Sequence, residues 1–312
     1  MRSRPSNRSN WYLRKKIRNN KHSYQYAIIE MEIVMGNKYK TVGELRDSIL
    51  TGAMQPPPEQ FTVCGSSYIY QTSKLPGASI VYENYYLLMR VEAYFGVCCH
   101  SAEQLEMKIA GQLSGLNLRD AISDSRLPVQ IAAMDAYLGN LFDHKEMCDK
   151  MIELPYGTTM QRAEIRDEIV ASTARVRSGQ RVALIGVVNP LVAAIRECGG
   201  ICLPCDFNME KTQWGDPVEK DMEKVLREAD SVICTAMTLG NGTFDRILEC
   251  AREKAIPLTV YAQTGSAVVA QFLGDGVTGL VAETFPLSQF SPYPTTIYQY
   301  LREEPTRVNG AI

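Results

Sequence analysis

The later half of the chain alternates short apolar runs with amphipathic stretches. Five apolar, β-branched runs follow Gln180, and a helical pattern comes after each of the first four: RVALIGV, GICLPCDF, SVICTA, PLTVYAQ and VTGLVAE. This alternation is typical of parallel strands joined by crossover helices. We therefore predict an α/β protein whose residues 181–290 form a Rossmann-like, doubly wound parallel sheet. Asp216 as N-cap and Pro217 as first helical residue predict the start of its second helix.

The earlier half has strand patterns first and helical patterns second. FTVCGSSYIYQT and ASIVYENYYLLMRVEAYF are predicted strands joined by a turn at KLPGA, whereas SAEQLEMKIAGQL and PVQIAAMDAYLGNLF are predicted helices. This order predicts an α+β domain over residues 31–155. Pro155 breaks the chain before a charged helical pattern, so we expect residues 156–180 to connect the two domains. Residues 291–312 are rich in Pro and Tyr, and we expect an irregular segment there.

Composition and charge narrow the classes of function. The 312 residues are 45% hydrophobic, which is ample for two packed cores. With 33 Lys and Arg against 35 Asp and Glu, the net charge of −2 gives no reason to expect a nucleic-acid partner. The basic residues 1–30 are predicted to be a disordered tail rather than a nucleic-acid or lipid contact.

Hydropathy and cysteine usage indicate a cytoplasmic protein. The chain lacks the roughly 18 uninterrupted apolar residues of a membrane span, and its basic start lacks the apolar region of a signal peptide. We therefore expect no membrane partner. The nine cysteines are predicted to be reduced thiols in packed positions. Oligomeric state stays open, with a symmetric homodimer among the alternatives.

Polar and small residues gather where predicted strands turn into helices. In an open α/β sheet such turns lie at the carboxyl ends of the strands, where ligands bind. Helix capping explains one such residue, but the turn TLGNGT after the third strand holds four polar or glycine candidates. We predict that three turns meet at one edge of the sheet and bind a ligand. The candidates are Asn189, Pro190, Thr238, Asn241, Gly242, Thr243, Thr264 and Gly265.

The first two strand ends bear on the choice of cofactor. The turn GVVNPL matches the dinucleotide fingerprint G-x-G-x-x-G only at Gly186, so a conventional NAD site is disfavoured. Asp206 ends the second strand, 20 residues later, where an acidic residue would hold a ribose. A solvated aspartate at a strand end is an equally good interpretation.

Metal-binding candidates are few. Cys98, Cys99 and His100 are ligands of the kind that Zn or Cu prefers, although core cysteines beside a satisfied histidine are the simpler interpretation. Cys202 and Cys205 form one C-x-x-C, but residues three apart in a strand point to opposite faces. With three histidines and no G-x-S-x-G motif, the sequence argues against hydrolysis by a catalytic triad.

The strand-to-helix turns together resemble a known family, described as putative heavy-metal chelation proteins. ADSVICTAMTLGNGTFDRILECAR and IGVVNPLVAAIRECGG carry the resemblance, and RVEAYFGVCCHSAEQL is similar in layout. The resemblance covers most of residues 31–285. It implies a Rossmann-like domain preceded by a domain with the fold of the enolase N-terminal half, and a cleft between them that handles metal chelates. The residues that it would place in the cleft are Asn189, Pro190, Thr238, Asn241, Gly242, Thr243 and Thr264.

Three hypotheses follow. The first is a two-domain protein that binds, and in one version modifies, a small polar or anionic ligand or metal chelate in the interdomain cleft. The second is a biosynthetic enzyme that holds a nucleotide-like cosubstrate such as S-adenosylmethionine, with Asp206 on the ribose. The third is a non-catalytic carrier or regulatory subunit. The cofactor stays open, with a divalent or heavy metal ion as one alternative.

Overall fold

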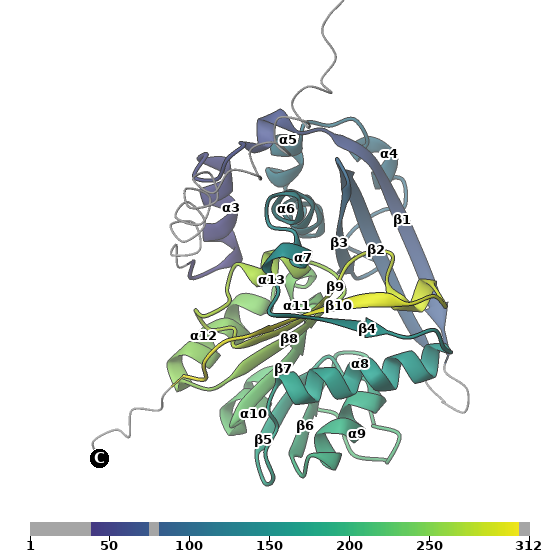
Figure 1. Cartoon of the computed structure of the whole chain (residues 1–312), viewed down its shortest axis with the longest axis vertical. Helices are drawn as coiled ribbons and strands as arrows, with labels where there is room; N and C mark the ends of the chain where they lie inside the picture. Colours follow the sequence, from purple (N-terminus) through teal and green to yellow (C-terminus); the bar gives the residue numbers. More distant parts are fainter. Residues whose placement is uncertain (1–38, 75–80, 306–312) are drawn as a thin grey trace, which may run out of the picture. The chain divides into compact units, whose positions relative to one another are not determined.

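A computed structural model describes residues 39–74 and 81–305 of the chain. The predicted basic tail, most of the predicted KLPGA turn and the end of the chain lie outside the described residues. Two sheets organise the rest: one of three strands from the earlier half and one of seven strands (Figure 1). Across the described ranges, no helix combines the length and the apolar character that a membrane span requires.

The seven-stranded sheet is the predicted doubly wound sheet with two additional strands. The order is β4-β10-β9-β8-β7-β5-β6, and the five strands from β5 to β9 run parallel. Counted along the chain, these five have the order 2-1-3-4-5, so the direction of winding reverses between β5 and β7. The strands are β4 (Lys150–Leu154), β5 (Arg181–Ile185), β6 (Ile201–Cys205), β7 (Ser231–Thr235), β8 (Leu258–Ala262), β9 (Gly279–Glu283) and β10 (Thr295–Leu301).

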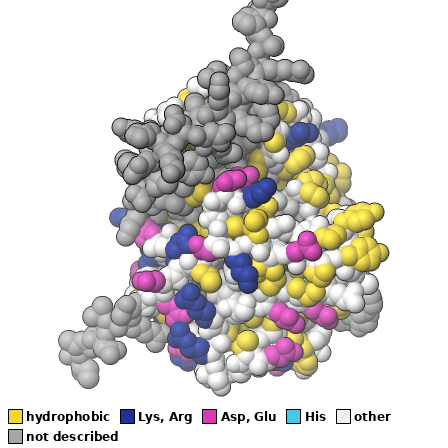
Figure 2. Space-filling view, in the orientation of Figure 1, with side chains coloured by type: hydrophobic (Ala, Val, Ile, Leu, Met, Phe, Trp, Pro, Cys, Tyr) yellow, Lys and Arg dark blue, Asp and Glu magenta, His cyan; other side chains and the backbone are white. Residues whose placement is uncertain are grey.

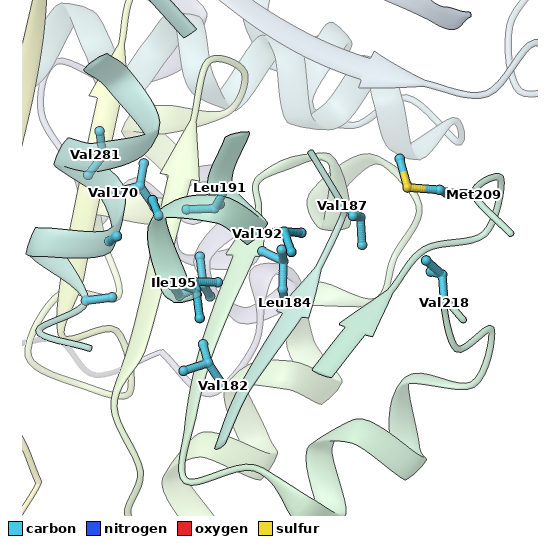
Figure 3. Close-up of a cluster of buried hydrophobic side chains, with 14 of the residues drawn as sticks. Val170, Val182, Leu184, Val187, Leu191, Val192, Ile195, Met209, Val218 and Val281 are labelled. Carbon is cyan, nitrogen blue, oxygen red and sulfur yellow. The ribbon is translucent and has the colours of Figure 1, made fainter. Parts of the chain in front are cut away.

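Helices cover both faces of this sheet, as right-handed crossovers in a doubly wound fold require. On one face, α8 and α9 pack on the strands through a core that includes Val170, Leu184 and Ile195 (Figure 3). Figure 1 shows α10 and α12 on the other side of the sheet. The helices are α8 (Thr159–Thr173), α9 (Asn189–Glu197), α10 (Met222–Glu228), α11 (Met237–Gly240), α12 (Phe244–Lys254) and α13 (Ser266–Ala270), with the 3-10 helix η2 (Ser288–Phe290).

The earlier half forms an antiparallel sheet against a buried helix. The sheet has the order β1-β2-β3, and α6 packs on β2 and β3. Eleven of the fifteen residues of α6 are buried, which matches its almost uniformly apolar sequence. The elements are β1 (Val63–Ser73), β2 (Tyr82–Val91), β3 (Tyr94–His100), α3 (Val42–Leu50), α4 (Ile109–Leu113), α5 (Leu118–Ile122), α6 (Leu127–Leu141), α7 (His144–Met147) and the 3-10 helix η1 (Pro58–Gln60).

Three local predictions were wrong. Residues 295–301, predicted to be irregular, form β10, because β9 and β4 both offer open edges to which this strand adds. Asp216 does not cap a helix: its carboxylate accepts hydrogen bonds from Thr212 and Arg196, and α10 begins only after Asp221. Of the helix predicted over residues 101–113, only α4 is helical. In the non-helical part, the Gln104 side-chain amide donates to the Gly240 carbonyl.

Charged side chains of both signs are mixed over the visible surface. On the face in Figure 2, Lys and Arg alternate with Asp and Glu without gathering into a patch of one sign. This distribution agrees with the net charge of −2. The described residues visible in Figure 2 form no broad cationic surface of the kind that binds nucleic-acid phosphates.

His144 lies fully buried at the junction of α7, α13 and β10. Its Nδ1 is 2.7 Å from the Tyr300 hydroxyl, and its Nε2 is 2.9 Å from the Ser266 hydroxyl. Burial lowers the pKa of His144 to about 4. The folded protein therefore holds a neutral imidazole at a pH where the unfolded chain, with a histidine pKa near 6.5, already takes up a proton.

We expect acid to destabilise the protein through this histidine. A depressed histidine pKa does not change the free energy of unfolding above pH 6.5. As pH falls toward 4 it lowers that free energy, because only the unfolded chain binds the proton. Since one pKa unit corresponds to about 1.4 kcal/mol, the loss relative to His144→Gln should approach about 3 kcal/mol near pH 4. Urea unfolding of both proteins between pH 7.5 and 4 checks this, and parallel pH profiles would contradict it.

Candidate functional site

A cavity of about 300 Å³ lies where the parallel strands β5, β6, β7 and β8 end. This is the point at which the strand order reverses, the usual ligand position in doubly wound folds. Its other walls come from the ends of β1 and β2, from α8 and from the segment around η2. Residues from each of these walls are Gly186, Asp206, Thr235 and Gln263 at the strand ends, Gln71, Tyr82 and Asn84 on β1 and β2, Arg166 on α8 and Gln289 in η2.

Arg166 supplies positive charge to the cavity wall. Its Nε donates to Asp167 Oδ1 over 3.0 Å, and among the described residues its two terminal nitrogens have no hydrogen-bond partner. Burial lowers the pKa of Arg166, but the negative charges of Asp167 and Glu283 outweigh that effect and leave it raised. The guanidinium is therefore charged, and its terminal N–H groups are available to a ligand.

Arg162, the neighbouring cation, is committed to the protein's own backbone. Its Nη1 donates to the carbonyls of Pro155 and Tyr293 over 2.6 and 2.8 Å, and its Nη2 donates to the Thr295 hydroxyl over 2.6 Å. These bonds tie α8 to the chain around β4 and β10. Arg162 is only 2% exposed, so its role is to hold α8 in place while Arg166, one turn later, faces the cavity.

A hydrogen-bonded chain of amides and a carboxylate fixes another part of the wall. The Gln263 amide nitrogen donates to Glu283 over 2.7 Å and to Gln289 Oε1 over 2.8 Å. Glu283 also accepts from the Ser288 backbone N–H. The Tyr86 hydroxyl donates to Gln71 across β1 and β2 over 3.3 Å. These bonds hold the polar side chains in place before any ligand arrives.

Three of the ligand-binding candidates line the cavity: Pro190, Asp206 and Thr264. Among the described residues, the Thr264 hydroxyl has no hydrogen-bond partner, which leaves it available. Asp206 is already engaged, because Oδ2 accepts from the Val187 backbone N–H and Oδ1 accepts from those of Asn208 and Met209. Its carboxylate therefore links the turns after β5 and β6, a role that the sequence did not indicate.

Four candidates serve local structure instead. Asn189 is buried and its Oδ1 accepts from the Gln213 backbone N–H over 3.0 Å, while the Thr238 hydroxyl donates to the Thr235 carbonyl over 2.7 Å. The side chain of Asn241 accepts from both the backbone and the hydroxyl of Thr243. None of the four is among the residues that line the cavity.

The two candidate glycines serve backbone geometry. Gly242 has a φ of +78° and Gly265 a φ of +63°, a region that residues with a side chain rarely adopt. Gly265 N–H donates to the Val97 carbonyl over 2.7 Å, which joins the turn before α13 to β3. These glycines shape turns beside the sheet edge, outside the cavity wall.

The cysteine and histidine candidates do not assemble a metal site. Cys98 and Cys99 are neighbours in β3, so their side chains point to opposite faces, and only Cys99 lines the cavity. Burial raises the pKa of Cys99 to about 12 and that of Cys98 well above its usual range, so both remain thiols. The His100 ring packs on Tyr68, and its Nδ1 lies 2.8 Å from the Ser101 carbonyl. Within residues 39–74 and 81–305, no group of three or more His, Cys, Asp and Glu could hold a metal ion.

The sequence-based search missed the contributions of α8 and of β1 and β2. Arg162 and Arg166 are four residues apart, which places them on one face of a helix, and that spacing was the available signal. Tyr82, Asn84 and Tyr86 alternate along β2 and therefore share one face of the sheet. Neither pattern predicts that these residues lie at the carboxyl ends of the strands in the seven-stranded sheet.

Fold and cavity define a class: a doubly wound α/β protein with a ligand-sized cavity at the point where its strand order reverses. The comparisons then show what the chain is similar to. The model of DUF364, described as "Putative heavy-metal chelation", matches residues 169–259, from α8 into β8, and confirms the resemblance predicted from the strand-to-helix turns.

Two solved structures agree with this assignment of the fold. A DUF364 protein of unknown function from Desulfitobacterium hafniense is 17% identical, with 82% of this chain and 98% of that chain covered and a TM-score of 0.54. One from Pyrococcus horikoshii is 16% identical, covers 82% and 97%, and has a TM-score of 0.52. At these identities the likeness shows the fold alone. A search of curated proteins finds no match. The proposed likeness to the enolase N-terminal half stays a prediction.

Proposed function

We propose that the cavity binds a small organic anion, free or as a metal complex, and that Arg166 is the main anchor of the ligand. The main support is that Arg166 places a charged guanidinium on the cavity wall. The terminal nitrogens of this guanidinium have no hydrogen-bond partner among the described residues. Such a group matches a carboxylate or phosphate, with which it can form two parallel hydrogen bonds. The position of the cavity at the reversal of strand order supports a ligand site independently.

A metal ion would enter as part of the ligand. The described side chains offer no cluster that could coordinate a bare ion, and the thiol of Cys99 is protonated. The family description names heavy-metal chelation. Both observations fit a chelate whose organic part supplies the donor atoms to the metal and the negative charge to Arg166.

Arg166→Gln should weaken binding of citrate by about tenfold or more. A hydrogen bond to a charged group contributes about 1.5 to 3 kcal/mol, and 1.4 kcal/mol corresponds to one factor of ten. The probes are citrate and its ferric complex, measured by isothermal titration at pH 7.5. Arg166→Lys, which keeps the charge but loses the planar fork, should bind with intermediate affinity.

A threonine pair provides the matched control. Thr264→Val removes a hydroxyl on the cavity wall and should weaken citrate binding several-fold, whereas Thr243→Val alters a turn outside the cavity and should not. Unfolding curves of all variants establish that they are folded. Equal binding by wild type and Arg166→Gln would refute the proposed anchor, and no binding of either probe to wild type would count against the proposed function.

Thermal unfolding with added S-adenosylmethionine tests the cosubstrate hypothesis. S-adenosylmethionine would raise the melting temperature, and Asp206→Asn would abolish that rise. Both oxygens of Asp206 already accept backbone N–H bonds, so this carboxylate is poorly placed to take two ribose hydroxyls as well. A citrate response that depends on Arg166, without a response to S-adenosylmethionine, favours the anion-binding function.

A further inference from the structure

Asp167 leaves one oxygen without a hydrogen-bond partner beside the cavity. Oδ1 accepts from Arg166 Nε, while Oδ2 is buried and has no partner among the described residues. The side chain is 1% exposed, and the residue forms part of the cavity wall. Folded proteins leave few such groups, because a buried acceptor without a donor costs about 1 to 3 kcal/mol, and more when it is charged.

The groups that surround Asp167 do not satisfy this oxygen. The Tyr261 hydroxyl, from β8, donates to the Gly186 carbonyl over 2.7 Å. Tyr82, from β2, has its pKa raised by burial and by the negative charges of Asp206 and Asp167, which places both carboxylates close to this ring. Asp206 adds negative charge to the same wall. Burial raises the pKa of Asp167, against the opposing effect of the Arg166 guanidinium. Asp167 Oδ2 is therefore an unpartnered acceptor with a second carboxylate nearby and the cationic Arg166 beside it.

We propose that the ligand is an amino-carboxylate, with its carboxylate on Arg166 and its protonated amine facing Asp167 Oδ2. This inference rests on the proposed anion-binding function and adds the chemical class of the ligand. The two side chains are consecutive on α8 and bonded to each other, so an anion site and a cation site lie next to each other. Carboxylate and ammonium groups in amino-carboxylates also lie close together.

Matched probes that differ only at the amine test the inference. Iminodiacetate and diglycolate have the same length and the same two carboxylates, but the first carries a protonated nitrogen where the second has an ether oxygen. L-Glutamate and glutarate form a second pair that differs by an α-ammonium group. In at least one pair, we expect wild type to bind the compound that carries the amine about fivefold or more tightly than the compound that lacks it. Competition against citrate at pH 7.5 measures both affinities.

Asp167→Asn should remove this preference selectively. The substitution keeps the shape but deletes the negative charge, so the affinity ratio within the pair should fall to about one, while diglycolate or glutarate binds as well as before or better. Arg166→Gln should weaken both members of the pair. Since Asp167→Asn could disturb α8, citrate affinity that is unchanged or higher in this variant serves as the internal control for an intact cavity.

The outcomes separate the two proposals. Equal affinity within both pairs, with citrate still bound through Arg166, overturns the amino-carboxylate inference and leaves anion binding standing. A preference that persists in Asp167→Asn also overturns it, because the amine is then recognised elsewhere. If wild type binds citrate but none of the four probes, the inference fails alone. If it binds neither citrate nor any probe, the proposed function fails first.

Discussion

Asp135→Leu is expected to lower the free energy of unfolding by roughly 2 to 6 kcal/mol. The Asp135 carboxylate, 2% exposed in α6, accepts from the Val97 N–H in β3 over 2.9 Å and from the Ala267 N–H in α13 over 2.8 Å. It therefore joins the antiparallel sheet to the helix that follows β8. Leucine would leave two buried N–H groups unpaired, at about 1 to 3 kcal/mol each.

The experiment is urea unfolding at pH 8.5. Burial raises the pKa of Asp135 to about 7, against the opposing effect of the backbone N–H donors, so the carboxylate is ionised at this pH. Asp135→Asn keeps one acceptor and should lose less than leucine does. Asp143→Ala removes an exposed N-cap acceptor for the Lys145 N–H and should cost only about 1 kcal/mol. A loss at Asp135→Leu no larger than that at Asp143→Ala would show that the junction does not depend on this carboxylate.

Gly240→Ala is expected to cost about 3 kcal/mol or more, although alanine favours helices. A Cβ at Gly240 would lie 2.1 Å from the Cys99 carbonyl oxygen and 3.0 Å from Cys98 Sγ. The first contact is with backbone, which cannot move aside without displacing β3 from α11. Overpacking of this kind costs typically 1 to 3 kcal/mol and more against a rigid neighbour. Loss of the hydrogen bond from Gln104 to the Gly240 carbonyl would add to it.

Gly111 provides the matched control for the alanine substitution. It also lies in a short helix, α4, but nothing lies within 4 Å of the position of its added Cβ. Gly111→Ala should therefore be neutral or stabilise by up to about 1 kcal/mol, the helix preference of alanine over glycine. Thermal and urea unfolding of both variants measure the difference. If Gly240→Ala and Gly111→Ala change the free energy of unfolding equally, the prediction is wrong, because α11 can then move away from β3 at little cost.

Structural contacts explain the turn TLGNGT better than a ligand role does. Thr238 caps the end of β7, Gly240 permits contact with β3, and Asn241 bonds to Thr243 before α12 begins. The sequence signal of small and polar residues was real. Its causes are hydrogen bonds within and just before the turn and, at Gly240, packing against β3, a neighbour that no local pattern identifies.

The sequence by itself determined the alternation of strands and helices from β5 to β9 and the position of the cavity at the carboxyl ends of these strands. Apolar runs and amphipathic stretches report which face of each element is buried, and parallel strands align their carboxyl ends, so Pro190, Asp206 and Thr264 could be expected near one cavity.

Only the tertiary structure decided which charges meet there. Arg166 and Asp167 belong to a helix outside the five-strand pattern, and Tyr82 comes from the other sheet. Likewise, β10 becomes a strand because β4 and β9 flank it, not because of its own residues alone. Contacts between elements far apart in the chain depend on packing across the fold, whereas hydrophobic periodicity reports only the burial of each element's own faces.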